Sequence, residues 1–120
     1  MDEIQDLTIL EKAKIDAENT AQELSIKYKK EITPFVFIIN EEPIVGYMQE
    51  PDRLSKMRAI DMYEASRTQA GDIILRTGLL QDESDKRILN EATENDSIYL
   101  GAIDFATKFV KIASEQLKKK

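Results

Sequence analysis

The chain contains no cysteine, no histidine and no tryptophan among its 120 residues, and only four glycines and three prolines. Without cysteine it forms neither a disulfide framework nor a thiolate metal site, and without histidine it lacks the commonest general base and the commonest transition-metal ligand. These absences exclude most familiar hydrolase chemistries. We therefore expect a protein that is not an enzyme and that needs no cofactor and no metal ion.

Long hydrophobic runs are missing too, because no apolar stretch approaches the roughly 18 residues of a membrane-spanning helix. The first six residues include three acidic side chains and no basic one, whereas a secretory signal begins with basic residues and an apolar run. With 17 basic against 23 acidic side chains, the formal net charge of -6 disfavours a phosphate backbone as partner. We expect a cytoplasmic protein with no membrane and no nucleic-acid partner. The basic clusters, Lys27, Lys29, Lys30 and Lys118–Lys120, follow predicted helices, where the helix dipole accounts for them.

Pairs of carboxylates are the remaining candidates for acid-base chemistry. Asp61 and Glu64 lie one turn apart on a predicted helix, and Asp82 and Asp85 bound an acidic loop. Catalysis needs surroundings that drive two pKa values apart inside a cleft, and the sequence shows no such isolation. The loop also lacks the central glycine of a calcium-binding EF-hand. A solvated face is the better interpretation of both pairs.

Residues 3–30 contain no glycine or proline and predict one long helix that ends before Thr33-Pro34. Spacings of three and four place one apolar stripe along it, and a repeat of eleven places a second stripe on another flank. The second stripe needs cover, either from the core of this domain or from another chain. The first stripe consists of Leu7, Leu10, Ala13, Ala17, Ala21, Leu24 and Tyr28, and the second of Ile4, Ile15 and Ile26.

A β-hairpin follows the helix. Residues 35–39 and 44–48 are rich in β-branched and aromatic side chains, and the segment Asn40-Glu41-Glu42-Pro43 between them is a turn signal. Both faces of the first strand are apolar, and an isolated hairpin is only marginally stable. Helices of this chain, or strands of a neighbour that extend the sheet, must therefore cover it.

The second half of the chain predicts helices. Residues 53–65 and 67–77 have helical periodicity, with Gly71 as a possible break and Gly78 as the stop. A short helix over residues 85–93 follows the acidic loop, and Asn95-Asp96-Ser97 caps the last helix. That last helix is apolar over about half its girth, so it is either central to the fold or shared with a partner. Its apolar rows are Ile98, Ala102, Phe105, Phe109 and Ile112, and Tyr99, Ile103, Ala106, Val110, Ala113 and Leu117; its solvated row is Asp104, Lys108, Lys111, Glu115 and Lys118.

These elements together predict an α+β fold, a mainly α-helical single domain with one β-hairpin and a long N-terminal helix. The N-terminal helix occupies residues 1–32, and the hairpin with the other helices occupies residues 33–120. The chain has the length of one compact domain.

With catalytic, metal-binding and nucleic-acid-binding functions excluded, the remaining feature of the sequence is apolar surface. It lies on the hairpin, on the last helix and on the second stripe of the N-terminal helix. Surplus apolar surface usually marks contact with a partner. We expect a protein partner or a homo-oligomer of this chain. The residues that we assign to contact or core, two roles that the sequence does not separate, are Phe35, Phe37, Tyr47, Phe105 and Phe109.

The order of elements over residues 35–120 follows a known pattern. After the hairpin comes a Pro-x-Arg helix entry, Pro51-Asp52-Arg53, and then a helix with the segment Ala70-Gly71-Asp72-Ile73-Ile74-Leu75. With the acidic loop and the last helix, this order resembles the phage tail assembly chaperone families. The resemblance implies a chaperone that coats the tape measure protein in the cytoplasm of a bacterial host and keeps it soluble until tail subunits polymerise around it.

Two features depart from that family pattern. Asp52 stands where Thr or Ser is common, and the N-terminal helix has no clear counterpart. The alternative is a structural subunit of a virion or of a host multiprotein complex, in which the N-terminal helix docks into a ring or bundle.

Overall fold

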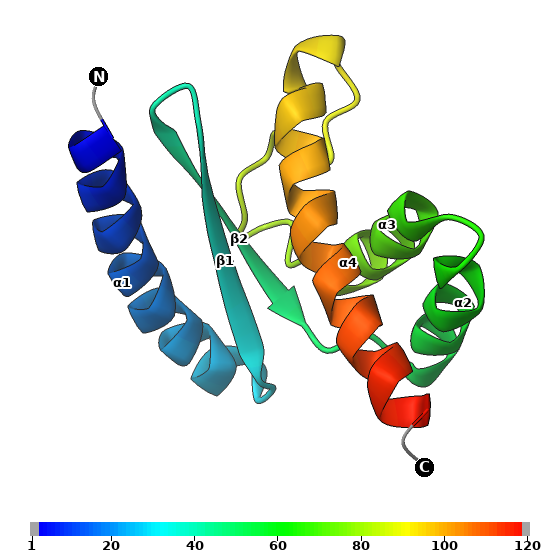
Figure 1. Cartoon of the computed structure of the whole chain (residues 1–120). Coiled ribbons are helices and arrows are strands. Elements are labelled where there is room, and N and C mark those ends of the chain that lie inside the picture. The colour runs from blue at the N-terminus through cyan, green and yellow to red at the C-terminus, as the bar shows by residue number, and fades with distance from the viewer. Residues whose placement is uncertain (1–2, 119–120) are drawn as a thin grey trace.

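The structure, a computed structural model, describes residues 3–118, with side chains described for residues 8–112 and for Glu115. It confirms the expected α+β fold, a mainly helical single domain with one hairpin and a long N-terminal helix (Figure 1). In chain order the elements are α1 (Glu3–Tyr28), β1 (Ile32–Ile39), β2 (Glu42–Gln49), α2 (Arg53–Tyr63), α3 (Arg67–Gly78), one turn of 3-10 helix (Thr93–Asn95) and α4 (Asp96–Lys118).

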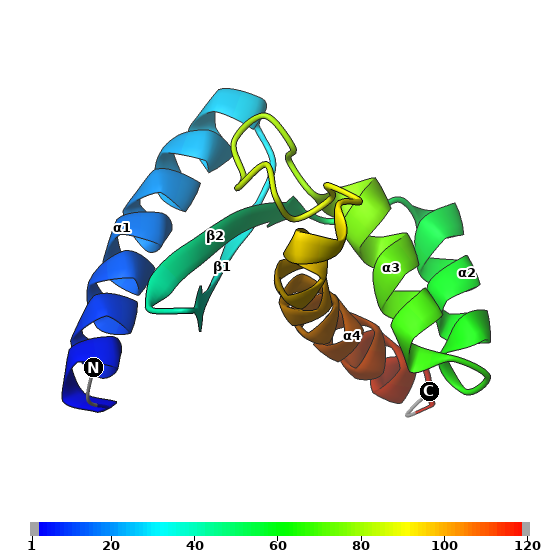
Figure 2. The ribbon, with the colours of Figure 1, turned by 90° about the horizontal axis from the view of Figure 1, so that it is seen from above.

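The hairpin forms the middle layer of the fold. Helix α1 covers one face of the two strands, while α4 and α3 cover the other, and α2 packs outside against α3 and α4 (Figures 1 and 2). Successive side chains of a strand point to opposite faces, so the two apolar faces of β1 feed two separate cores. Helices of this chain therefore cover both faces, one of the two alternatives that the sequence left open.

The alanine stripe of α1 packs on the hairpin as its spacing predicts. Ala17, Ala21 and Leu24 are buried against Ile32 and Tyr47, and the small alanines allow the helix to approach the strands closely. The second stripe is not covered by the described part of the chain, since Ile15 and Ile26 are 60% and 80% exposed. The predicted stripe members Ile4 and Leu7 lie outside the described side chains.

A two-residue turn closes the hairpin, which makes it tighter than the four-residue turn that the sequence suggested. Asn40 and Glu41 both have positive φ, at 50° and 67°, the signature of the type I′ turn that matches the twist of two strands. Glu42 and Pro43 belong to β2, where Pro43 pairs with Ile38.

The segment after α3 lies along the outer edge of β2 instead of forming the helix expected over residues 85–93. The amides of Leu80 and Asp85 donate to the carbonyls of Tyr47 and Val45, at 2.8 and 2.9 Å, and the Ser84 hydroxyl accepts from the Tyr47 amide. The predicted helix was wrong: Asp85 bonds to β2, and the residues after it form single turns, in which the amides of Ile88 and Asn90 donate to the carbonyls of Asp85 and Arg87. Regular structure resumes only at Thr93–Asn95.

The break between α2 and α3 lies where the predicted segments 53–65 and 67–77 meet, and not at Gly71, the possible break. It falls just before Ser66, whose hydroxyl caps α3 by accepting from the Gln69 amide, whereas Gly71 lies buried inside α3. A Cβ on Gly71 would come within 2.5 Å of the Thr107 hydroxyl, so this glycine serves the close approach of α3 and α4. On α2 it is Ser55 and Ala59 that are buried, whereas the helically spaced Leu54 and Met57 are exposed.

Helix α4 is central to the fold. It contacts α2, α3 and β1, and its buried residues are Ile98, Ala102, Ile103, Ala106 and Val110. The row of Asp104, Lys108, Lys111 and Glu115 is exposed as predicted. Ala113, Leu117 and Lys118–Lys120 lie outside the described side chains. Within residues 3–118, no helix has the length and apolar character needed to cross a membrane.

Candidate functional site

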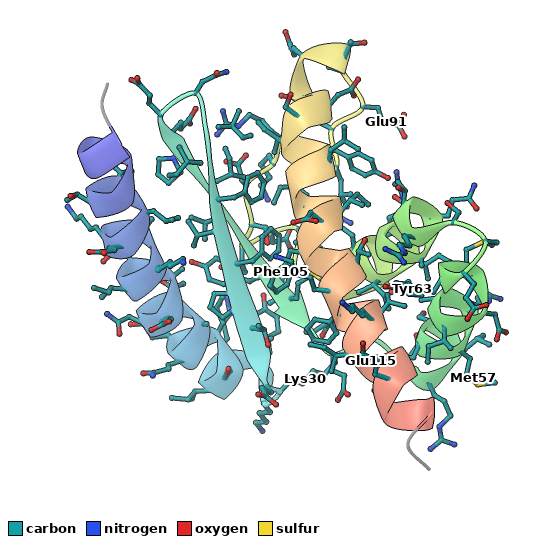
Figure 3. The ribbon with its side chains drawn as sticks, in the orientation of Figure 1. Lys30, Met57, Tyr63, Glu91, Phe105 and Glu115 are labelled. Carbon is teal, nitrogen blue, oxygen red and sulfur yellow. The ribbon has the colours of Figure 1, made fainter. Side chains whose placement is uncertain are left out.

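Four phenylalanines meet where β1 faces α4, and we call Phe35, Phe37, Phe105 and Phe109 the phenylalanine cluster. The ring centroids of Phe35 and Phe105 lie 4.7 Å apart in a stacked pair. Phe37 stacks on Phe35 at 6.2 Å, and Phe109 lies 6.3 Å from Phe105. Figure 3 shows Phe105 in the seam between the strand and the helix. Aromatic pairs at these separations stabilise one another beyond their burial alone.

The local structure explains why the rings converge. Phe35 and Phe37 are two residues apart on a strand and share one face, and Phe105 and Phe109 are four apart on a helix and share one side. Gly101 brings α4 close enough to β1 for the two pairs to meet, because a Cβ there would lie 2.5 Å from the Phe37 ring.

The five aromatic residues assigned to core or contact differ in burial. Phe35 is 5% exposed and is a core residue of the cluster. Tyr47 is 7% exposed and belongs to the opposite core, beneath α1, so it does not join the phenylalanines. Phe37, Phe105 and Phe109 are only partly buried and keep ring surface at the outside of the molecule.

A groove lies beside the cluster between α1 and α4. Its volume is about 350 Å³. Helix α1 forms one wall, β1 the floor and Phe105 of α4 the other wall. The lining residues are Lys14, Ala17, Glu18, Pro34, Phe35, Val36 and Phe105.

A second, smaller pocket of about 210 Å³ lies at the other end of the cluster, where α2, α3 and α4 meet. The two charged residues that line it, Glu50 and Lys56, form an ion pair with each other. The other lining residues are Pro51, Ala59, Ile60, Ile74, Phe109, Val110 and Ile112. Sequence reasoning missed this pocket because its walls come from separate elements.

The groove and the pocket are joined by partly exposed apolar side chains. Phe105 lines the groove, whereas Phe109 and Ile112 line the pocket, and Ile112 is 56% exposed. We call Phe37, Phe105, Phe109 and Ile112 the apolar strip. An exposed apolar row of this kind, with two hollows along it, can bind apolar side chains of another molecule.

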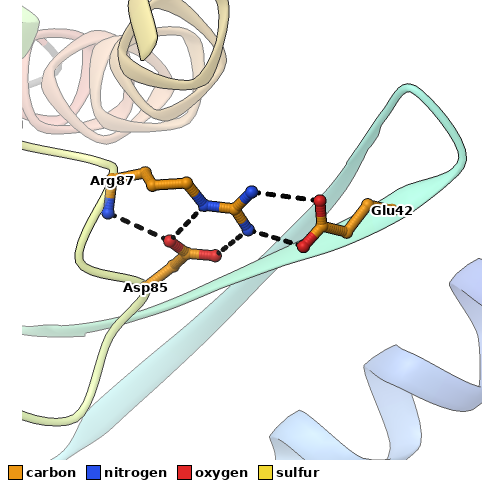
Figure 4. Close-up of polar contacts among 3 residues, drawn as sticks. All are labelled: Glu42, Asp85 and Arg87. Carbon is orange, nitrogen blue, oxygen red and sulfur yellow. Dashed lines mark hydrogen bonds and ion pairs between the residues drawn. The ribbon is translucent and has the colours of Figure 1, made fainter. Parts of the chain in front are cut away.

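Polar residues near the hairpin turn hold the fold together. Arg87 donates two hydrogen bonds to the Glu42 carboxylate, at 2.8 and 3.0 Å, and two more to the Asp85 carboxylate (Figure 4). Its hydrogen bonds lower the pKa of both carboxylates, and these in turn raise the pKa of Arg87. The arginine thereby ties the segment after α3 to the hairpin.

A second polar contact joins α3 and α4. The Tyr99 hydroxyl donates to the Asp72 carboxylate, which also accepts from Arg76 one turn later on α3. Burial, and after it the hydrogen bond to Asp72, raise the pKa of Tyr99. The Tyr99 hydroxyl and the Asp72 carboxylate therefore join α4 to α3.

The carboxylates singled out in the sequence lie apart from the apolar strip. Asp61 and Glu64 are exposed on or just after α2, and Asp85 is held by Arg87. Within the described residues, no three acidic side chains come together in an arrangement that could hold a metal ion.

No family model, curated protein or solved structure matches this chain. The resemblance to tail assembly chaperones therefore stays a prediction, and the apolar strip is the feature of the molecule that indicates a function.

Proposed function

We propose that this protein is a non-catalytic binding factor that holds an apolar segment of a largely helical partner protein along the apolar strip. The observation that carries this proposal is the partial exposure of Phe37, Phe105 and Phe109, of which Phe105 lines the groove and Phe109 the pocket. Large apolar side chains remain partly exposed although the fold already has two cores. Such side chains can form an interface with a partner.

A tail assembly chaperone is the form of this proposal that the order of elements favours, with the tape measure protein as partner and the host bacterial cytoplasm as location. The departure at Asp52 weighs little, because its carboxylate accepts from the Ser55 amide at 2.8 Å and so caps α2. Thr and Ser do the same at this position of a helix. The net charge of -6 suits a protein that must stay soluble while its partner contributes apolar surface.

Co-expression with the tape measure protein of the same genome tests the proposal. We expect the two proteins to co-purify and the tape measure protein to remain in the soluble fraction. Phe109→Ser with Ile112→Ser should weaken the complex by about 2 kcal/mol, roughly thirtyfold in Kd, as for central interface residues.

The matched control is Leu100→Ser, which removes another exposed apolar residue of α4, 54% exposed, that lines neither the groove nor the pocket. It should leave the complex intact. A genome without a tape measure protein, or co-expression with neither association nor a gain in solubility, would count against the chaperone.

The structural subunit of a virion or host complex is a second candidate, favoured by one observation. Ile15 and Ile26 are exposed on α1, where a neighbouring helix could cover them. Sedimentation separates the two functions, because a stable closed ring indicates a subunit and a monomer or small concentration-dependent oligomer indicates a chaperone. A ring that Ile15→Ser with Ile26→Ser disrupts would favour the subunit.

A further inference from the structure

The two edges of the hairpin differ. The edge of β2 is occupied, because backbone and side-chain groups of residues 79–85 bond to Val45 and Tyr47. β1 has β2 on one side, and its other edge lies at the groove between α1 and α4. In Figure 1 this edge is the one in front.

The pairing register tells which backbone groups point outward from β1. The backbone groups of Val45 and Tyr47 bond to residues 79–85 and therefore point away from β1. In an antiparallel pair, opposite residues share this direction, so the backbone groups of their cross-strand partners, Val36 and Pro34, point away from β2. The same alternation turns Ile38 outward, opposite Pro43. Both prolines thus occupy positions where no ladder hydrogen bond is lost, as expected at edges.

The outward groups of β1 are therefore the amides of Val36 and Ile38 and the carbonyls of Pro34, Val36 and Ile38. Within the described residues, no hydrogen bond satisfies these groups, whereas the Ile32 amide near the start of the strand donates to the Ser25 hydroxyl. No charged side chain stands in β1, although edge lysines are a common protection against pairing. The edge is open to a further strand.

We infer that the outer edge of β1 binds an extended segment of another polypeptide as a third strand. This inference rests on the proposed function and specifies the form of the partner at the groove. Strand addition gives affinity through main-chain hydrogen bonds and selectivity through alternate side chains.

The walls of the groove define the chemistry of that segment. One set of its side chains faces the Phe105 ring and should be apolar or aromatic. The alternate set faces Lys14, Ala17 and Glu18 on α1 and should be polar, or small beside the alanine. The segment therefore alternates between apolar and polar residues.

A second copy of this chain does not fit the same edge. Paired strands lie about 4.8 Å apart, whereas packed helices need about 8–10 Å between their axes. α1 lies mainly over β1, and on the other face α4 lies over β1 while α3 lies over β2. Two copies paired through β1 would bring like helices too close on both faces. A lone extended segment has no such helices.

Selection of random linear peptides about ten residues long, the upper length of ordinary strands, on the full chain tests this inference. We expect enriched sequences to alternate apolar and polar residues. The best peptide should slow hydrogen exchange at the amides of Val36 and Ile38. Val36→Pro should weaken its binding about tenfold or more, while Leu100→Ser, at an exposed residue that lines neither the groove nor the pocket, should change it little.

Val36→Pro is expected to fold because Pro34 already occupies an outward position of this edge. The exchange measurement on the unmodified chain does not depend on that variant. Selected peptides whose apolar residues recur at the helical spacings of three and four, and whose affinity falls with Phe109→Ser but not with Val36→Pro, would overturn strand addition. They would leave the proposed function standing. A selection without binders, or binders that leave both amides unprotected, would also overturn it.

Discussion

The ring of Phe35 lies directly across Gly46, its cross-strand partner in the hairpin. A Cβ on Gly46 would come within 2.1 Å of the ring, and the same ring stacks on Phe105 of α4. An aromatic ring over a strand glycine fills the space that the glycine leaves. This contact therefore couples the hairpin to the last helix and sets the base of the apolar strip.

Gly46→Ala should destabilise the protein, because the added methyl group forces the packed Phe35 ring to move. Overpacking of this kind costs about 1–3 kcal/mol in the free energy of unfolding. Phe35→Leu removes the obstructing ring, so the cost of Gly46→Ala should be smaller in that background. A double-mutant cycle by urea denaturation measures the coupling. Strictly additive effects would show that the ring and the glycine do not interact.

Ser84→Ala should destabilise the covered edge of β2. The Ser84 hydroxyl is buried and accepts from the Tyr47 amide at 3.0 Å, so its removal leaves a buried donor unsatisfied. Such a loss costs about 1–3 kcal/mol. We expect the Tyr47 amide to exchange faster with solvent. The exposed Ser97→Ala is the matched control, and equal effects of both changes would contradict this role.

Arg87→Gln should change how stability depends on pH. Hydrogen bonds from Arg87 hold the pKa of Glu42 and Asp85 below their ordinary values near 4. A carboxylate with a lowered pKa in the folded state adds stability above its unfolded pKa and loses it as the pH falls through the folded value. The free energy of unfolding should therefore fall less steeply below about pH 5 in the variant than in the unmodified protein.

Urea denaturation at a series of pH values measures this difference. At neutral pH the variant should be the less stable protein, and the two curves should converge in acid, where both carboxylates are protonated. Arg53→Gln removes an exposed arginine of α2 and serves as the control for net charge. Parallel curves for Arg87→Gln and the unmodified chain would contradict the assignment.

The fold could be predicted where sequence period and local chemistry agree. The alanine spacing of α1 predicted its buried stripe, and the β-branched and aromatic run of β1 predicted the strand. The course of residues 80–85, which lead into the segment predicted as a helix, could not be predicted, because Leu80, Ser84 and Asp85 bond to Val45 and Tyr47, which are distant in sequence. Gly71 was misjudged since its packing against α4 outweighs its low helix propensity.

The candidate site could be predicted only in part. Four of the five aromatic residues singled out do meet, but their periodicity does not distinguish Phe35 in the core from Phe105 at the surface. Tyr47 could not be assigned to the other core without knowing which face α1 covers. The groove and the pocket depend on how helices are placed around the hairpin, and a single sequence carries no direct record of that placement.

Hydroxyl-radical footprinting of the free chain and of its complex with the tape measure protein tests the central claim most directly. It compares the oxidation rate of each exposed apolar side chain with and without partner. The account predicts that oxidation of Phe37, Phe105, Phe109 and Ile112 slows in the complex, while Leu54 and Met57 on α2 are unaffected. Protection confined to Ile15 and Ile26, with the apolar strip as reactive as before, would contradict it.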